Sequence, residues 1–84
     1  MAKIEIYTTN TCPYCARAKN LLNAKDVDFT EIDLTGKGEE RDALVQRTGM
    51  RTVPQIFING QLIGGSDDLH VLEEKGELDR LLAQ

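Results

Sequence analysis

Two cysteines separated by two residues stand where a strand-like segment gives way to a helix-like segment. Residues 3–8 alternate polar and apolar side chains and are rich in β-branched residues, which predicts a β-strand. Pro13 suits the first turn of a helix because its missing N–H and fixed φ do no harm there. Residues 14–25 are good helix formers with one apolar face. Cys12 and Cys15 therefore lie at the start of a helix that closely follows a strand.

The start of a helix gives these two cysteines different surroundings. If Cys12 is the N-cap, the backbone N–H groups of Tyr14 and Cys15 lack partners within the helix and can donate to its sulfur. The helix dipole favours negative charge at the same end, so both effects favour the thiolate, which is the attacking species. Helix geometry places the two Cα atoms roughly 5 Å apart, within the range of a disulfide. We predict that Cys12 is a nucleophile and that Cys15 is its resolving thiol.

Composition narrows the class of protein. A length of 84 residues predicts one domain, 1–84, and a net charge of −4 argues against nucleic-acid binding, which needs clustered Lys and Arg. No stretch approaches the roughly 20 apolar residues of a membrane span, and no apolar run of signal-peptide length begins the chain. We therefore expect a cytoplasmic protein without membrane partners, acting as a monomer.

A structural disulfide and a metal site are the weaker interpretations of the cysteine pair. A bridge between Cys12 and Cys15 closes a very short ring, so it constrains the unfolded chain little. A zinc site needs about four ligands, and the remaining candidates are His70 and scattered carboxylates. A redox-active pair is the favoured interpretation, and no metal is expected.

The remaining segments complete an α/β pattern. Strand signals cover 27–34, 55–58 and 61–63, with a slip of phase near Thr30 that allows a bulge. Helix signals cover 39–48, 66–75 and 77–82. Gly49 is expected to end the first of these helices, and Ser66 is expected as the N-cap of the second. Asn59-Gly60 predicts a type I′ turn between the last two strands. The order β-α-β-α-β-β-α predicts a four-stranded mixed sheet flanked by helices, beginning with a parallel βαβ unit.

Three motifs make the chain resemble the glutaredoxins over essentially its whole length. They are Thr11-Cys12-Pro13-Tyr14-Cys15, Thr52-Val53-Pro54-Gln55-Ile56-Phe57-Ile58 and Gly64-Gly65-Ser66-Asp67-Asp68. The resemblance implies a thioredoxin-like fold and a glutathione-dependent thiol–disulfide oxidoreductase that serves cell redox homeostasis. Its partners would be glutathione, as co-substrate, and proteins that carry disulfides or glutathione mixed disulfides.

The resemblance also implies the residues of the site. Pro54 would be cis and would count with Cys12 and Cys15 as catalytic, while the backbone of Val53 would pair with the glutathione peptide like an added strand. The γ-glutamyl carboxylate would lie at the start of the helix at Ser66. The implied glutathione-binding residues are Tyr14, Arg41, Thr52, Val53, Gly65, Ser66, Asp67 and Asp68. Among them, Asp67 or Asp68 would hold the γ-glutamyl ammonium and Arg41 would contact the glycyl carboxylate.

The sequence differs from many glutaredoxins at two positions, and two alternative functions are open. Many relatives have a Lys where this chain has Thr9, which predicts weaker glutathione binding, and many have a Cys at the position of Ser66. A thioredoxin-type protein disulfide reductase is one alternative function. A glutathione-ligated iron–sulfur cluster carrier is the other.

Overall fold

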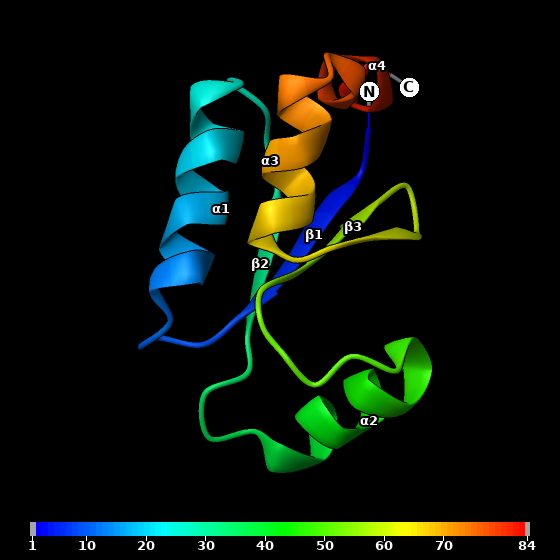
Figure 1. The fold of residues 1–84 in the computed structure, drawn as a ribbon. Helices are drawn as coiled ribbons and strands as arrows, with labels where there is room; N and C mark the ends of the chain where they lie inside the picture. The colour runs from blue at the N-terminus through cyan, green and yellow to red at the C-terminus, as the bar shows by residue number, and fades with distance from the viewer. Residues whose placement is uncertain (1, 84) are drawn as a thin grey trace.

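A four-stranded mixed sheet forms the centre of the computed structural model, which describes residues 2–83 (Figure 1). Its strands are β1 (Ile4–Thr8), β2 (Thr30–Asp33), β3 (Gln55–Ile58) and β4 (Gln61–Gly64), in the spatial order β2-β1-β3-β4. β1 runs parallel to β2 and antiparallel to β3, and β4 is antiparallel to β3. The predicted mixed sheet and its parallel βαβ beginning are confirmed.

Helices cover both faces of this sheet. They are α1 (Pro13–Ala24), α2 (Gly38–Thr48), α3 (Ser66–Glu74) and the short α4 (Glu77–Leu82). α1 and α3 lie side by side on one face, and α2 lies apart from them (Figure 1). Within residues 2–83, no helix combines the length and the apolar composition that crossing a membrane requires.

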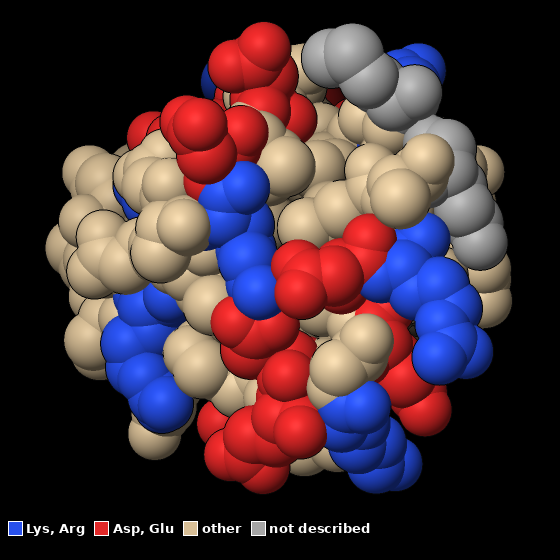
Figure 2. Space-filling view, turned by 90° about the horizontal axis from the view of Figure 1, so that it is seen from above, with Lys and Arg blue, Asp and Glu red and all other residues tan. Residues whose placement is uncertain are grey.

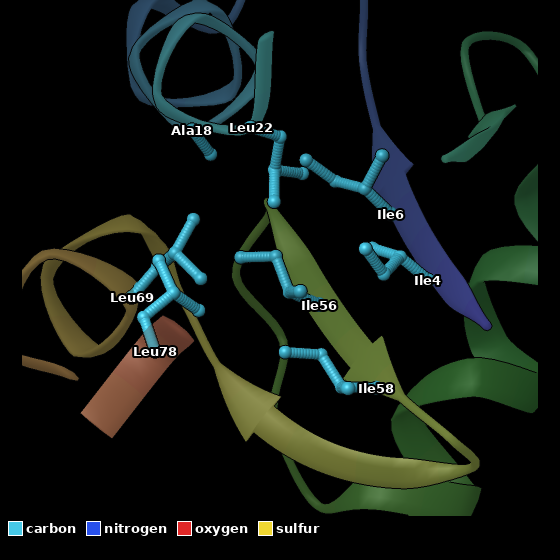
Figure 3. Close-up of a cluster of buried hydrophobic side chains, with 8 residues drawn as sticks. All are labelled: Ile4, Ile6, Ala18, Leu22, Ile56, Ile58, Leu69 and Leu78. Atoms are coloured by element: carbon cyan, nitrogen blue, oxygen red, sulfur yellow. The ribbon is translucent and has the colours of Figure 1, made fainter. Parts of the chain in front are cut away.

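The larger hydrophobic core lies between the sheet and the pair α1 and α3. It joins eight buried residues: Ile4, Ile6, Ala18, Leu22, Ile56, Ile58, Leu69 and Leu78 (Figure 3). β1 and β3 each contribute two isoleucines, and the helical side chains point toward them (Figure 3). Burying this apolar surface holds the start of α1 against the carboxyl end of β1.

A smaller core fixes α2 on the opposite face. Leu44 of α2 packs with Leu34 and Phe57, and the ring of Tyr7 meets the ring of Phe57 edge-on at 5.7 Å. The Arg47 guanidinium lies 4.5 Å from the centroid of the Phe57 ring. Alternation along β1 explains the division, because successive side chains of a strand point to opposite faces.

The second strand is shorter than predicted. The sequence indicated 27–34, whereas β2 covers Thr30–Asp33. Asp26 takes a left-handed conformation with φ of 58° just after α1, and residues 27–29 lead from there to the strand. Val27 and Phe29 still pack against the larger core, which explains their strand-like pattern. The break in the polar–apolar alternation near Thr30 therefore marks the beginning of β2. The bulge-like irregularity lies instead between Ile56 and Phe57, where β3 pairs with β4.

The predicted turn and helix end are confirmed. Asn59 and Gly60 have φ of 54° and 82°, the positive values that a type I′ turn requires. Gly49 ends α2 with φ of 75° in the left-handed region.

Lys25 joins the ends of three helices. It is the C-cap of α1, and its ammonium pairs with Glu73 of α3 and, at 2.9 Å, with Asp79 of α4. These pairs raise the pKa of Lys25, the Glu73 hydrogen bond contributing most. Seen from the end of the molecule where α4 lies, basic and acidic side chains are interspersed (Figure 2).

Gly64 offers a test of how the sheet meets α3. Its φ is 124°, and a Cβ there would overlap the Asp68 carboxylate. We expect Gly64→Ala to lower the free energy of unfolding by about 2 kcal/mol, because the backbone would be strained. Urea denaturation measures this.

Gly38→Ala is the matched control, because Gly38 lies in α2 with no atom within 4 Å of an added Cβ. Its free energy of unfolding should stay the same or rise by up to about 1 kcal/mol. Equal losses in the two variants would contradict the analysis.

Candidate active site

Cys12 is the N-cap of α1, as predicted, with extended backbone angles of −95° and 112°, and Pro13 follows in the first turn. Its sulfur is half-exposed and makes no capping hydrogen bond. The Cys12 thiol instead donates to the carbonyl oxygen of Val53 at 3.5 Å. The predicted hydrogen bonds from the backbone of Tyr14 and Cys15 to this sulfur are therefore not formed in this structure.

Cys15 lies beneath the first turn of α1 and is only 1% exposed. Burial raises the pKa of its thiol to about 11, with the neighbouring Cys12 sulfur acting in the same direction and the Thr9 backbone acting against them. At neutral pH, Cys15 is therefore a protonated thiol. The two cysteines therefore differ in exposure: the sulfur of Cys12, the predicted nucleophile, is the more accessible one, and that of Cys15, the predicted resolving thiol, is buried.

A groove with a volume of about 240 Å³ lies where three segments of the chain meet. The segments are the start of α1, the loop 50–54 and the start of α3. The residues that line the groove are Tyr14, Met50, Thr52, Val53, Pro54, Gly65, Ser66, Asp67 and Asp68. The structure thus brings together eight of the residues that the resemblance implied, although they come from distant parts of the sequence.

Gln55 holds the loop on one side of this groove. It is 1% exposed, and its side-chain amide donates to the carbonyl oxygens of Met50 at 2.8 Å and Thr52 at 3.2 Å. The peptide bond between Val53 and Pro54 is cis, as the resemblance implied. Sequence reasoning missed Gln55 as a support of the site. Its signal was a polar residue at the head of an otherwise apolar strand.

The start of α3 differs from the prediction by one residue. Gly65, not Ser66, is the N-cap, and its N–H donates to the Asp68 carboxylate at 3.0 Å. Ser66 is the first helical residue and is buried. Asp68 is the third residue of the helix, and its carboxylate folds back to the N–H of the N-cap as in a capping box. Asp67 remains exposed at the groove.

Two further residues lie differently from the sequence expectation. Arg41 does not line the groove, and its guanidinium donates to the carbonyl oxygen of Arg51 at 3.2 Å, so it supports the loop from α2. Its contact with the glycyl carboxylate stays a prediction. Met50, which the sequence did not single out, adds a thioether side chain to the groove. Among residues 2–83, no three His, Cys, Asp or Glu side chains converge to hold a metal ion.

Comparison with known proteins identifies the family. The glutaredoxin family model matches residues 4–63. Glutaredoxin 3 of Escherichia coli K12 is 54% identical over 82 residues, which covers 98% of this chain and 99% of that protein. A glutaredoxin of Pseudomonas aeruginosa is 54% identical over 83 residues and is covered to 99% in both chains. The chain belongs to the glutaredoxin family.

Solved structures agree with this assignment. A buckwheat glutaredoxin–glutathione complex superposes on this glutaredoxin with a TM-score of 0.90 at 33% identity, covering 98% of this chain and 77% of that one. A glutaredoxin of Brucella melitensis gives 0.87 at 50% identity, covering 98% and 89%. The thioredoxin-like fold is confirmed, and this glutaredoxin is a thiol–disulfide oxidoreductase.

The burial of Cys15 predicts selective alkylation of the reduced glutaredoxin. At pH 7 iodoacetamide should add one group, at Cys12, because a thiol with a pKa of about 11 is roughly 0.01% thiolate at that pH. The rate at Cys15 should rise about tenfold for each pH unit between 7 and 9. Peptide mass spectrometry assigns the adducts, with Cys12→Ser as the control that lacks the fast reaction. Comparable rates at both sulfurs at pH 7 would refute the assignment.

Proposed function

We propose that this glutaredoxin reduces protein–glutathione mixed disulfides and protein disulfides, with Cys12 as the nucleophile and glutathione as the reductant. The observation that carries the proposal is the pairing of two unlike sulfurs. Cys12 is accessible beside a peptide-sized groove, whereas Cys15 is buried behind it. The family supports the general activity, and the buckwheat complex supports glutathione as the ligand.

Reduction of a mixed disulfide needs Cys12 alone. Its thiolate attacks the glutathione sulfur of the protein–glutathione disulfide, and the protein leaves as a thiolate that takes a proton from solvent. A second glutathione thiolate then attacks the glutathione sulfur bound to Cys12. Glutathione disulfide is released and Cys12 returns as a thiolate, so the net reaction consumes one free glutathione, which leaves joined to the glutathione of the substrate.

Reduction of a protein disulfide needs both cysteines. Cys12 attacks one sulfur of the target and forms a mixed disulfide. Cys15 loses its proton to solvent and attacks the Cys12 sulfur, which releases the reduced target and closes the Cys12–Cys15 disulfide. Two glutathione molecules then reopen that disulfide. Glutaredoxin potentials lie near the glutathione poise, so the direction follows the glutathione pool.

Glutathione lies along the groove in this proposal. The backbone of Val53 pairs with the tripeptide, as an edge strand would, and brings the glutathione sulfur toward Cys12. The γ-glutamyl carboxylate accepts from free N–H groups in the first turn of α3, where the helix dipole is favourable. Of the two aspartates implied for the ammonium, Asp67 is the better placed, because Asp68 already accepts from Gly65.

The other lining residues shape the groove around that peptide. Tyr14 is 54% exposed at the start of α1, beside the sulfur, and offers an aromatic face to the bound peptide. Thr52 lines the side formed by the loop, and Pro54 closes it. We infer that the clients are disulfide-bonded and glutathionylated proteins of the cytoplasm, where thiols are kept reduced.

The decisive experiment separates the two cysteines. Cys15→Ser should still turn over a glutathionylated peptide, because that reaction does not use Cys15. Cys12→Ser should fall to the uncatalysed background. The readout is glutathione disulfide formation coupled to glutathione reductase. Loss of activity in Cys15→Ser, or activity above the background in Cys12→Ser, would contradict the proposed roles of the two cysteines.

Gln55→Met tests whether the loop must be held for glutathione binding. Methionine keeps the size of the side chain but cannot donate to the carbonyls of Met50 and Thr52. We expect KM for a glutathionylated peptide to rise about fivefold with little change in kcat, which corresponds to roughly 1 kcal/mol of lost binding.

Gln61→Met serves as the control, because Gln61 is exposed in β4 and away from the groove. Steady-state kinetics at a temperature where all forms are folded give the comparison. An unchanged KM in Gln55→Met would show that the hydrogen bonds from Gln55 to the loop do not position the glutathione site.

A further inference from the structure

A charged side chain lies one helical turn beyond the buried cysteine. Lys19 follows Cys15 by four residues in α1, the spacing that places two side chains on the same face of a helix. Its ammonium does not extend freely into solvent, because it pairs with the Glu31 carboxylate at 3.0 Å. Lys19 is partly buried, with 33% of its side chain exposed.

Glu31 is itself held from the strand that leads to the cysteines. The hydroxyl of Thr8, which is 1% exposed at the end of β1, donates to the same carboxylate oxygen at 2.7 Å. This hydrogen bond and the Lys19 ammonium lower the pKa of Glu31, the contact with Thr8 contributing most. The carboxylate is therefore charged at neutral pH, and the three side chains form a fixed row from β1 across β2 to α1.

Within this row the Lys19 ammonium acts on Cys15, where it lowers the pKa against the larger effect of burial, which raises it. The Cys12 sulfur and the Lys19 ammonium are the side-chain groups whose charges bear on the pKa of Cys15, and they act in opposite directions. Lys19 favours the Cys15 thiolate, whereas a negative Cys12 disfavours it. Once Cys12 is in a mixed disulfide it carries no charge, so the opposing influence disappears and that of Lys19 remains.

We propose that Lys19, fixed by Glu31 and Thr8, is a positioning residue for the resolving step, in which its ammonium stabilises the Cys15 thiolate as that thiolate attacks the mixed disulfide at Cys12. The inference rests on the proposed roles of the two cysteines and adds a residue to them. Lys19 is expected to matter for protein disulfides, which need Cys15, and not for glutathione mixed disulfides, which do not.

The step balances without an outside oxidant. Cys15 gives its proton to solvent, its sulfur forms a bond to the Cys12 sulfur, and the bond between Cys12 and the target sulfur breaks. The target leaves with the electron pair as a thiolate. The two cysteines are oxidised to one disulfide, and the target disulfide is reduced by two electrons.

The size of the effect follows from two opposing tendencies. Each unit by which the pKa of a thiol exceeds the ambient pH lowers the thiolate fraction about tenfold, while nucleophilicity rises by roughly threefold. The net change is about threefold in rate for each unit. We expect loss of the Lys19 charge to slow the resolving step roughly twofold to fivefold.

An aromatic disulfide that releases a coloured thiolate, 5,5′-dithiobis(2-nitrobenzoate), separates the two steps in one stopped-flow trace. Attack by Cys12 releases the first coloured thiolate at a rate that depends on reagent concentration. Attack by Cys15 releases the second at a rate that does not, because the step is intramolecular. Cys15→Ser identifies the second phase by removing it.

Lys19→Gln should slow the second phase and leave the first within twofold of the unaltered protein, and Lys19→Arg should restore the second phase. Lys3→Gln, which removes the same charge from an exposed position, should change neither phase beyond the effect of net charge on the anionic reagent. Urea midpoints of all variants show whether folding has changed.

Three results would overturn the inference: an unchanged second phase in Lys19→Gln, an equal slowing of both phases, or no rescue by Lys19→Arg. Failure of the proposed function looks different. In that case the unaltered protein would give no fast first phase, or Cys12→Ser would keep it.

Discussion

The burial of one sulfur directly behind a partly exposed one is the constraint on which the rest of this glutaredoxin depends. It arises because α1 begins at Pro13 and packs its apolar face on β1 and β3, so the first turn of the helix covers Cys15 while its N-cap leaves Cys12 at the surface. A thiol without water around it stays protonated at neutral pH. The difference in chemistry between two identical side chains is thus a consequence of helix packing.

The second requirement is a groove next to the partly exposed sulfur, and the loop 50–54 forms one side of it. That loop has little regular structure of its own, so its shape depends on side chains that reach it from outside. Gln55 holds two of its carbonyl groups, Arg41 holds a third, and Cys12 donates to Val53. The shape of this loop therefore depends on side chains that lie outside it.

Much of the fold was predictable because local signals and packing agreed. The type I′ turn at Asn59-Gly60, the helix end at Gly49 and the helix 77–82 follow from short-range chemistry and appear as expected. The predictions were wrong where the same local sequence pattern is compatible with two different structures. Apolar residues before β2 pack on the core without joining the sheet, and the cap of α3 moved to Gly65 once the Asp68 carboxylate folded back.

By itself, the sequence determined the element order, the redox pair and, through its resemblance to glutaredoxins, eight of the nine residues that line the groove. Only the tertiary structure decided that Cys15 is buried, that Gln55 clamps the loop, and that Thr8, Glu31 and Lys19 form a row behind the cysteines. The physical reason is that burial and hydrogen bonding between distant segments depend on how helices and strands pack. Periodicity along the chain reports which face of an element is apolar, not which polar groups meet across it.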